Sequence, residues 1–471
     1  MQNESPGNKP IDVLILAAGL GTRMRSSIAK VLHKLGETPL ISHVCRTAAA
    51  LGPEKIYVVV GHQADEVKKA VLEEIEADRV EFVTQKEQLG TGDAVNAARE
   101  HFTDRDSTLL ILSGDVPLIR HETLASLVQY HHNHRGRGAT ATVLTVKLKD
   151  PTGYGRVVRS GEGLFDRIVE QKDASQSELE INEINAGIYC FDSRKLFTAL
   201  AEVKNDNAQG EYYLTDVPAM LREAGDDVAV YTHGDHKEIE GVNNRVQLAE
   251  MERVLRRRTV QRLMLDSGVT FIDPKSVYIS ERAKFGRDTI VYPNVTVEGT
   301  TEIGDGCTIR QGTRLTNARV GHGVEILDNC VVVDSEIGNG CTVGPMAHLR
   351  GKAVMMEGAK VGNFVEMKKT RLGRGSKANH LTYLGDATIG DKTNIGAGTI
   401  TCNFDGKNKH ETHIGNDVKI GSDTMLVAPI KVGDGAATGA GSVVTKDIEP
   451  NKLAVGAPAR AIKTLKADDT S

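Results

Sequence analysis

A six-residue repeat runs through the carboxy-terminal part of the chain and limits what this part can fold into. Aliphatic residues recur at every sixth position, with occasional one-residue slips, and glycine commonly follows them, as in Ile303-Gly304 and Ile389-Gly390. Such a repeat is typical of a parallel β-helix, in which each face of a coil is a very short strand with its aliphatic side chain inside. With three faces per turn, residues 267–450 are expected to form about ten coils.

One longer segment interrupts this register. Cys402–His413 does not follow the six-residue period, which predicts a protruding loop there. Glycine is concentrated in the same part of the chain, because residues 251–471 hold 28 of the 48 glycines. The two parts of the chain are therefore predicted to be built differently.

The amino-terminal part alternates apolar runs with helical segments. Three runs have the composition of strands buried on both faces: Asp12–Ala17, Lys55–Val60 and Thr108–Leu112. Two segments between them have helical spacing: Leu40–Leu51 and Ala64–Ala77. Two further strands are expected around a substrate pocket: Thr140–Lys147 and Asn185–Phe191. This alternation predicts an α/β domain, Rossmann-like, with a mostly parallel sheet covered by helices.

A linker helix is predicted between the two parts. In Val246–Asp266, three apolar residues, Leu248, Met251 and Leu255, share one helix face. The run Arg256–Arg258 could bind phosphate or nucleic acid, but a solvated linker face is the favoured interpretation. The predicted organisation is thus an α/β domain at 1–245, a linker helix at 246–266 and a β-helix domain at 267–471.

Composition excludes several classes of protein. Lys and Arg number 58 and Asp and Glu 63, and this net charge of −5 argues against a broad affinity for nucleic acid. No run of 18 apolar residues exists, which excludes a membrane-spanning helix, and Val13–Leu20 lacks the basic flank of a signal peptide. The six cysteines show no CxxC or zinc spacing, so we expect reduced thiols in a cytoplasmic protein.

A glycine-rich turn follows the first predicted strand, at Gly19-Leu-Gly21. The backbone N–H groups of such a turn can hold phosphate oxygens, and Arg23 and Lys30 would offset their charge. Met24 stands where a dinucleotide-binding motif needs its third glycine, and no Walker A motif is present. Phosphate binding is therefore favoured over an ordinary tight turn.

Asp115 follows the predicted strand 108–112, at the edge where open α/β sheets bind ligands. A carboxylate in this position is a candidate ligand for Mg²⁺, which prefers hard oxygen donors and keeps phosphates as partners. A helix N-cap or a turn aspartate explains a single Asp equally well.

Several motifs together carry a family resemblance. The Gly19 turn with Lys30 resembles the signature of sugar-1-phosphate nucleotidylyltransferases. Four further motifs narrow the resemblance: Gln88–Gly92, Asp150–Gly155, Gln209–Asp216 and Gly241–Arg245. With the hexapeptide part included, nearly the whole chain resembles the bacterial bifunctional N-acetylglucosamine-1-phosphate uridyltransferases/glucosamine-1-phosphate acetyltransferases.

The resemblance implies two reactions and an assembly. The left-handed parallel β-helix would transfer an acetyl group from acetyl-CoA to glucosamine 1-phosphate. The α/β domain would then transfer uridylyl from UTP, with Mg²⁺, and release pyrophosphate. The product, UDP-N-acetylglucosamine, would feed cell-envelope precursors such as peptidoglycan. A homotrimer is also implied, with acetyl-transfer sites shared between adjacent β-helices.

In the α/β domain, the resemblance assigns roles residue by residue. It implies that Arg23 and Lys30 stabilise the triphosphate and the charge at phosphorus, and that Asp115 and Asn243 bind Mg²⁺. The residues implied to contact UTP or the nucleotide sugar are Leu16, Ala17, Ala18, Gly19, Lys30, Gln85, Gly90, Thr91, Ser113, Gly114, Asp115, Gly155, Glu170, Asn185 and Asn243.

In the β-helix, the resemblance implies that His380 is the general base for the substrate amine and that Glu366 orients it. A free imidazole, with a pKa of about 6.5, can accept a proton at neutral pH. The residues implied to bind the sugar phosphate are Arg350, Lys368, Tyr383 and Asn394. Those implied to bind acetyl-CoA are Ala397, Asn403, Phe404, Ser422 and Ala440.

The chain departs from the family pattern at four positions. Ala29 replaces a proline before the lysine and is expected to loosen that loop, and Ser113 replaces a tyrosine of some relatives. Phe404 replaces a tyrosine and Ala457 an arginine that binds coenzyme A in some relatives, with Arg460 three residues further on. These two changes are expected to affect coenzyme A affinity more than the reaction.

Two other functions remain open from the sequence: nucleotidyl transfer alone, with the β-helix serving assembly, and a non-catalytic scaffold. His131–His134 could bind a metal, but its Arg and Gly neighbours favour a solvated loop. Cys307 and Cys341 fall on repeat positions and are expected to be buried. The tail at Asp468-Asp469 is expected to be disordered.

Overall fold

The computed structural model describes residues 9–19 and 21–464, so Leu20 and the tail at Asp468-Asp469 lie outside the described residues. The chain divides into two compact units, Met1–Leu255 and Arg256–Ser471. Each unit has its own buried apolar core. None of the described helices is long and apolar enough to cross a membrane.

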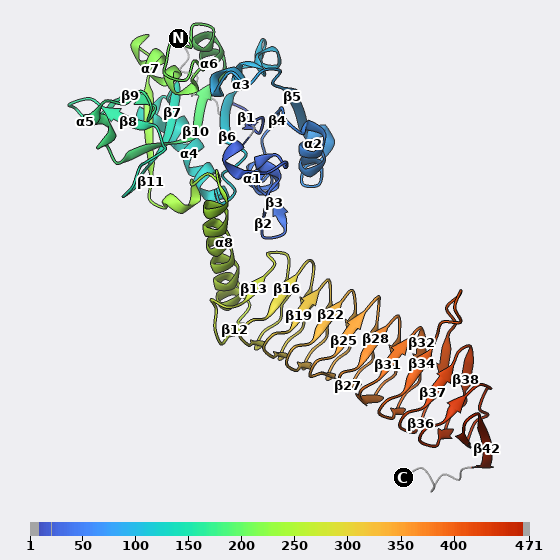
Figure 1. The fold of residues 1–471 in the computed structure, drawn as a ribbon. Coiled ribbons are helices and arrows are strands. Elements are labelled where there is room, and N and C mark those ends of the chain that lie inside the picture. The colour runs from blue at the N-terminus through green and yellow to red at the C-terminus, as the bar shows by residue number, and fades with distance from the viewer. Residues whose placement is uncertain (1–8, 20, 465–471) are drawn as a thin grey trace, which may run out of the picture. The chain divides into compact units, whose positions relative to one another are not determined.

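The first unit is built on a mixed sheet with the strand order β11-β7-β10-β6-β1-β4-β5 (Figure 1). Strands β6, β1, β4 and β5 run parallel to one another, and β10 pairs antiparallel with both β6 and β7. The strands are β1 (Ile11–Leu16), β4 (Lys55–Val60), β5 (Val80–Thr84), β6 (Thr108–Ser113), β7 (Ala141–Lys147), β8 (Arg156–Arg159), β9 (Phe165–Val169), β10 (Glu183–Asp192) and β11 (Val228–His233), with a small hairpin of β2 (Lys34–Leu35) and β3 (Thr38–Pro39).

Helices cover both faces of this sheet. The helices are α1 (Leu40–Ala50), α2 (Ala64–Leu72), α3 (Thr91–Asn96), α4 (His121–Asn133), α5 (Gln176–Leu179), α6 (Ser193–Leu200) and α7 (Val217–Glu223). Val13 and Ile15 of β1 belong to one core cluster with α1, α2 and α4, whereas Leu14 belongs to a second cluster with α3, α6 and α7. Successive side chains of a strand point to opposite faces, so a continuous apolar run is needed when both faces are covered.

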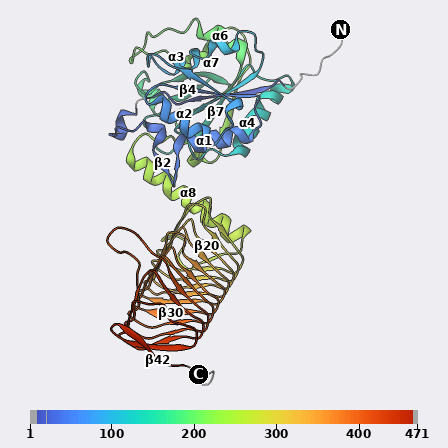
Figure 2. The ribbon, with the colours of Figure 1, turned by 90° about the vertical axis from the view of Figure 1, so that its right-hand side faces the viewer.

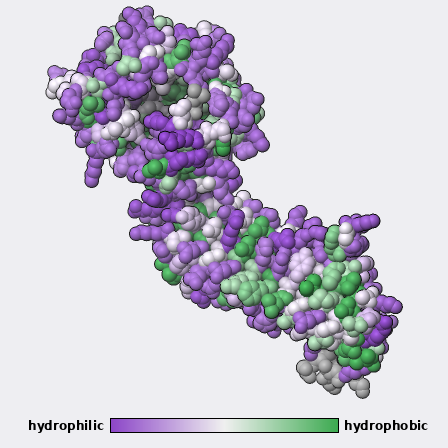
Figure 3. Space-filling view, viewed as in Figure 1, coloured by the Kyte–Doolittle hydropathy of each residue, from purple (hydrophilic) through white to green (hydrophobic). Residues whose placement is uncertain are grey.

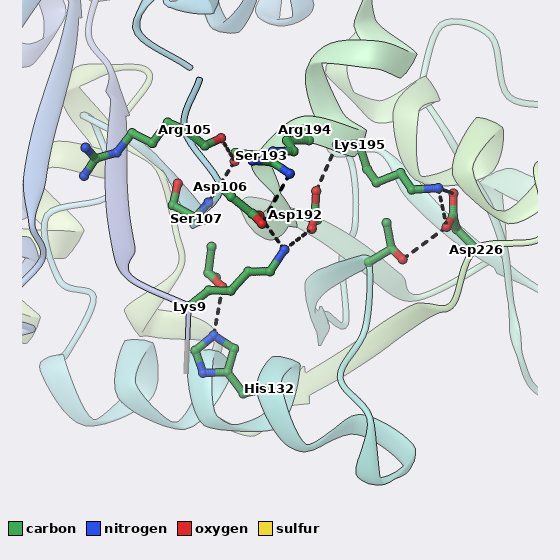
Figure 4. A network of polar contacts seen from close by, with 12 residues as sticks. Lys9, Arg105, Asp106, Ser107, His132, Asp192, Ser193, Arg194, Lys195 and Asp226 are labelled. Carbon is green, nitrogen blue, oxygen red and sulfur yellow. Dashed lines mark hydrogen bonds and ion pairs between the residues drawn. The ribbon is translucent and has the colours of Figure 1, made fainter. Parts of the chain in front are cut away.

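A polar network lies at the end of the sheet where the parallel strands begin (Figure 4). The Lys9 ammonium lies 2.5 Å from a carboxylate oxygen of Asp106 and 2.6 Å from one of Asp192. Asp192 also caps helix α6 by accepting the Lys195 backbone N–H at 3.0 Å. These ion pairs tie the segment before β1 to the start of β6 and the end of β10.

The long helix α8 (Arg245–Asp266) contributes to both cores. Its residues Met251 and Leu255 are buried in the first unit, and Val260 and Leu263 are buried in the second. The arginine run is not only a solvated face, because the guanidinium of Arg256 lies 4.6 Å from the centre of the Tyr278 ring.

The second unit is a parallel β-helix with three flat faces (Figures 1 and 2). Face 1 contains β12 (Thr270–Phe271), β15 (Ile290–Val291), β18 (Thr308–Ile309), β21 (Glu325–Ile326), β24 (Thr342–Val343), β27 (Lys360–Asn363), β30 (Lys377–His380), β33 (Asn394–Ile395), β36 (Lys419–Ile420), β39 (Ala437–Thr438) and the closing hairpin of β41 (Lys452–Gly456) and β42 (Ala459–Thr464).

The other two faces continue each coil. Face 2 contains β13 (Tyr278–Ile279), β16 (Thr296–Glu298), β19 (Arg314–Thr316), β22 (Val331–Val333), β25 (His348–Arg350), β28 (Glu366–Lys368), β31 (Tyr383–Gly385), β34 (Ile400–Cys402), β37 (Met425–Val427) and β40 (Val443–Val444). Face 3 contains β14 (Lys284–Phe285), β17 (Glu302–Ile303), β20 (Arg319–Val320), β23 (Glu336–Ile337), β26 (Val354–Met355), β29 (Arg371–Leu372), β32 (Ala387–Ile389), β35 (Thr412–Ile414) and β38 (Ile430–Val432).

The six-residue repeat explains this core. Residues at the repeat positions, such as Leu315, Leu349 and Leu384, are fully buried and form one continuous cluster along the β-helix. Cys307 and Cys341 are buried in it, as predicted. The predicted fold class is therefore confirmed, and the break in the repeat is a loop between β34 and β35 that projects from the β-helix (Figure 2).

Candidate active sites

Four polar side chains converge in the first unit beyond the carboxyl ends of β1 and β6. The Lys30 ammonium contacts the Asp115 carboxylate and lies 3.3 Å from the amide oxygen of Asn243. Arg23 donates to the same amide oxygen at 3.0 Å. The structure thus brings together Arg23, Lys30, Asp115 and Asn243, which are as much as 220 residues apart in sequence.

Three loops hold this cluster in place. Gly21 has a left-handed backbone with φ of 61°, and a side chain there would collide with Lys30. The Gly114 backbone N–H donates to Leu16 at 2.9 Å, and the Val242 N–H donates to Asp115 at 2.9 Å. The turn after β1, the turn after β6 and the Gly241–Arg245 motif are therefore fixed against one another.

The oxygen atoms of Asp115 and Asn243 fit a divalent cation. Both already converge on one positive charge, the Lys30 ammonium. A carboxylate and an amide oxygen are hard donors, and a Mg²⁺-like ion completes such a site with phosphate oxygens and water. Among the described residues, no group of three or more His, Cys, Asp or Glu side chains could hold a metal.

The histidine cluster has another role. His131 and His132 belong to helix α4, so the predicted solvated loop is wrong at these residues. Burial lowers the pKa of His131 to about 4, and its ring bonds Thr142 at 2.9 Å. The helix continues to Asn133 because its inner face packs against the sheet, which the flanking Arg and Gly did not reveal.

The two motifs Gln88–Gly92 and Gln209–Asp216 lie side by side. Gly90 has φ of 116°, and any side chain on it would strike the backbone of Tyr212. The Gly92 N–H donates to the Tyr212 carbonyl at 2.8 Å, and the Leu214 N–H donates to the Thr91 hydroxyl at 3.1 Å. Gln85 is buried and donates to Asp93 at 2.7 Å, which places it behind the same turn.

The residues assigned to the amino sugar form a second group on the sheet. The Asn185 N–H donates to the Gly155 carbonyl at 2.9 Å, and its side-chain amide donates to Tyr189 at 2.6 Å. Glu170 accepts a hydrogen bond from Thr215 at 3.3 Å, and burial raises the pKa of this carboxyl. Thr215 was missed from sequence, although it lies within the Gln209–Asp216 motif.

Ala29 does not leave its loop loose, contrary to expectation. The residue is buried, and its backbone N–H donates to the side-chain oxygen of Gln63 at 2.6 Å. Proline has no N–H and could not form this bond. A hydrogen bond thus replaces the rigidity of a proline ring just before Lys30. Ser113, another departure, ends β6 beside the cluster.

In the β-helix, charged side chains stack on successive coils of face 2. Arg350 pairs in register with Lys368, and Glu366 pairs with Tyr383. The Arg350 guanidinium contacts one oxygen of Glu366 at 2.6 and 2.7 Å. The charge of Arg350 is therefore engaged by Glu366, and Lys368 lies beside Arg350 on the next coil.

His380 is oriented by a different residue from the one expected. Its Nδ1 atom lies 2.9 Å from the amide oxygen of Asn363, whereas Glu366 is engaged with Arg350. The prediction that Glu366 orients His380 is therefore wrong for this structure. Asn363 stands 17 residues before His380, about one coil, and the two residues pair directly in the parallel register.

The residues assigned to acetyl-CoA follow the same corner of the β-helix. His380, Ala397, Ser422 and Ala440 each precede a residue with positive φ at the corner between face 1 and face 2. The side chains of Ala397, Ser422 and Ala440 along this corner are small. Asn394 is not brought beside His380 within the chain, because it pairs with Lys377 at the other end of the strand.

The projecting loop adds residues to this site. The side-chain amide of Asn403 donates to Asp386 at 2.6 Å. Phe404 is 59% exposed, and its backbone forms an isolated antiparallel β-bridge with that of Lys409 across the loop. Contact with the Lys368 ammonium lowers the pKa of Lys409. Two adjacent ammonium groups favour an anion between them, which makes Lys409 a candidate site residue that was missed from sequence.

The departure at Ala457 is at the end of the β-helix. Ala457 lies in the exposed turn between β41 and β42. Arg460 is exposed on β42, where its guanidinium donates to the Ala459 carbonyl at 3.2 Å. Nothing in the structure gives Arg460 the role of the missing arginine.

Comparisons with known proteins agree with both halves. The nucleotidyl transferase family matches residues 12–236, a GMPPB C-terminal domain family matches 274–373, and the bacterial transferase hexapeptide family matches 411–446. The bifunctional protein GlmU of Heliobacterium modesticaldum is 48% identical over 94% of this chain and 94% of its own length. Those of Shouchella clausii and Syntrophomonas wolfei are 46% and 44% identical over 94% of this chain, and 95% and 97% of their own lengths.

Proposed function

The chain belongs to the family of the bifunctional GlmU proteins, and from this membership we propose how its two units divide two reactions. It is a bifunctional enzyme with a nucleotidyltransferase domain and a hexapeptide acetyltransferase domain. We propose that the second unit acetylates glucosamine 1-phosphate and that the first unit couples the product to UTP. The convergence of Arg23, Lys30, Asp115 and Asn243 carries the assignment of the first unit.

In uridylyl transfer, a phosphate oxygen of N-acetylglucosamine 1-phosphate attacks the α-phosphorus of UTP, and pyrophosphate leaves in line. Such a step depends on positioning and charge neutralisation rather than on a covalent nucleophile. Lys30 and Arg23 offset the charge of the phosphates and of the transition state. Asp115 and Asn243 would hold the divalent cation, proposed to be Mg²⁺, which would supply further neutralisation when bound.

In acetyl transfer, the substrate amine must lose its proton before it can attack a thioester. His380 takes that proton, the amine nitrogen bonds to the acetyl carbon, and the carbon–sulfur bond of the thioester breaks. The nitrogen then loses its extra proton, which the departing coenzyme A thiolate takes up, so the products are the amide and the free thiol. Lys368 and Lys409 hold the sugar phosphate between their ammonium groups. The corner of Ala397, Ser422 and Ala440 receives the pantetheine arm.

The order of the reactions follows from their substrates, since the acetylated sugar phosphate is the acceptor for uridylyl. The resulting nucleotide sugar, UDP-N-acetylglucosamine, would supply cell-envelope synthesis in the cytoplasm. Each half-reaction can be measured separately in the intact protein. Thiol release should need acetyl-CoA and glucosamine 1-phosphate, and pyrophosphate release should need UTP, Mg²⁺ and N-acetylglucosamine 1-phosphate. Pyrophosphate release without any thiol release would favour the alternative in which the β-helix serves assembly alone.

A homotrimer is supported by one row of corner residues. At the corner between face 1 and face 2, most positive-φ positions hold residues that tolerate this conformation: Asn294, Gly312, Asn329, Gly398, Asp423 and Gly441. Met346, Phe364 and Leu381 are bulky apolar exceptions and are 48%, 54% and 63% exposed. Bulky residues in the left-handed region cost about 1–3 kcal/mol each. We propose that this apolar ridge packs against another copy of the chain, beside His380.

Replacing Phe364 with aspartate is expected to dissociate the assembly, because a charge would be buried at the centre of the ridge. The mass in solution, measured by sedimentation, should fall from that of a trimer toward that of a single chain. Leu164→Asp is the matched control, because Leu164 is 48% exposed in the first unit and outside the ridge. A Phe364→Asp protein that keeps the mass of a trimer would contradict this use of the ridge.

Replacing Lys409 with alanine is expected to raise the KM for glucosamine 1-phosphate about tenfold, the equivalent of one charged hydrogen bond. The kcat should change little, since Lys409 holds the phosphate rather than the reacting amine. Lys407→Ala on the same exposed loop is the control. Equal KM values for the two variants, measured by thiol release, would remove Lys409 from the phosphate site.

A further inference from the structure

The contact between His380 and Asn363 lies on an unusually extended part of face 1. Strands β27 and β30 contain four residues each, whereas the neighbouring strands β24 and β33 contain two. The pairing between them therefore reaches the corner, where Asn363 is in register with His380. The Leu381 N–H also donates to the Asn363 carbonyl at 3.1 Å, so the backbone is fixed beside the side-chain contact.

The chemistry of the contact fixes where the imidazole carries its proton. The amide oxygen of Asn363, 2.9 Å from Nδ1 of His380, can only accept a hydrogen bond. Nδ1 must therefore hold the hydrogen in the neutral ring. The lone pair is then on Nε2, the nitrogen left to act as a base.

The charged side chains near the pair of Asn363 and His380 either form ion pairs with other residues or lie on adjacent strands. On face 2, Glu366 is paired with Arg350. On face 1, Lys377 begins the strand that His380 ends, and it is in register with Lys360 of β27. Lys368 and Tyr383 occupy the neighbouring strands of face 2. Of the described side chains, Asn363 is the one that bonds the His380 ring.

We propose that Asn363 is a positioning residue for acetyl transfer, and that it keeps His380 in the Nδ1–H form with Nε2 free to take the proton of the substrate amine. The inference rests on the proposed role of His380 as base. It replaces the expected carboxylate partner with a neutral amide. A neutral partner orients the ring without adding a negative charge that would stabilise the imidazolium strongly, so the ring can accept a proton and pass it on.

Asn363→Ala and Asn363→Asp separate orientation from simple packing. Alanine removes the acceptor, and the kcat of acetyl transfer should fall about 10- to 100-fold, with the KM for glucosamine 1-phosphate within about twofold of normal. Aspartate keeps an acceptor for Nδ1–H but adds a charge that stabilises the imidazolium. Its acid limb in the pH profile of kcat should move to higher pH, with activity recovering toward the normal value as the pH rises.

Asp328→Ala is the matched control. Asp328 occupies the same position as Asn363, directly before a corner residue with positive φ. It lies two coils earlier and away from His380. This variant should keep its normal kcat. Uridylyl transfer, measured on the same samples, should remain unchanged in all three variants and reports that the first unit is folded. The KM for glucosamine 1-phosphate, expected within about twofold of normal, reports that the β-helix site is folded.

The outcomes distinguish this inference from the proposed function. An unchanged kcat in Asn363→Ala overturns the positioning role. So does an Asn363→Asp protein that is impaired equally at every pH, which indicates damaged packing. If His380→Ala itself retains acetyl transfer, the assignment of His380 as base fails, and the positioning role fails with it. Loss in Asn363→Ala with pH-dependent recovery in Asn363→Asp supports the proposal.

Discussion

Replacing His380 with alanine is expected to abolish acetyl transfer and to leave uridylyl transfer intact. Without the imidazole, the Nε2 atom that takes the proton of the amine is missing. A general base of this kind contributes about 100- to 10,000-fold to the reaction rate. The uridylyl site is unaffected, because all its assigned residues lie in the first unit, which has its own core. Thiol release and pyrophosphate release from one preparation measure the two effects together.

His322→Ala provides the comparison for this variant. His322 is an exposed histidine of the same β-helix, and its ring lies 3.2 Å from an oxygen of Asp305, remote from the acetyl-transfer residues. Both activities should survive its removal. Loss of both activities in a folded His380→Ala protein would mean that the two sites are not separate.

Replacing Asp115 with alanine is expected to have the reverse effect. The variant loses the carboxylate that holds Lys30 and fits the divalent cation, so charge at the phosphates is no longer neutralised in place. Uridylyl transfer should fall about 1,000-fold or more, by analogy with the loss of a strong electrostatic contact in other active sites. Acetyl transfer by the β-helix should remain at its normal rate.

Asp104→Ala serves as the control for Asp115→Ala, since Asp104 is exposed just before β6, at the opposite end of that strand from Asp115. Its uridylyl transfer should equal that of the unchanged protein. An Asp115→Ala protein that keeps full pyrophosphate release would remove this carboxylate from the reaction and leave the cation site without its charged ligand.

The sequence was most informative where one physical constraint repeats. An inward-facing aliphatic residue is needed once on each face of each coil, so residues such as Ile337, Val343 and Leu349 mark three successive faces, and all three are buried. Apolar runs in the first unit likewise predicted β1, β4 and β6 because both faces of that sheet are covered. Such patterns involve local periodicity alone.

Side-chain partners were harder to predict, because several neighbours satisfy the same spacing. Glu366 and Asn363 stand 14 and 17 residues before His380, and the family resemblance favoured the carboxylate. The coil length near 17 residues favours Asn363, which is in register with His380. The coil length alone would therefore have predicted Asn363 as the partner of His380.

Residues outside the repeat carried no such signal. Lys409 lies on the projecting loop, and only the fold of that loop brings it to Lys368. The Ala29 backbone N–H likewise donates to the side-chain oxygen of Gln63, which is distant in sequence. No local pattern encodes this hydrogen bond. His131 was misjudged because its flanking residues resemble a loop, whereas its burial is decided by the sheet beneath helix α4.

The most direct test of the two-reaction account uses acetyl-CoA labelled in its acetyl group. The purified protein would be incubated with glucosamine 1-phosphate, UTP and Mg²⁺, and the nucleotide sugar would be isolated. We expect the label in UDP-N-acetylglucosamine, with one thiol and one pyrophosphate released for each product molecule. Nucleotide sugar that forms only from ready-made N-acetylglucosamine 1-phosphate, without label, would contradict the account.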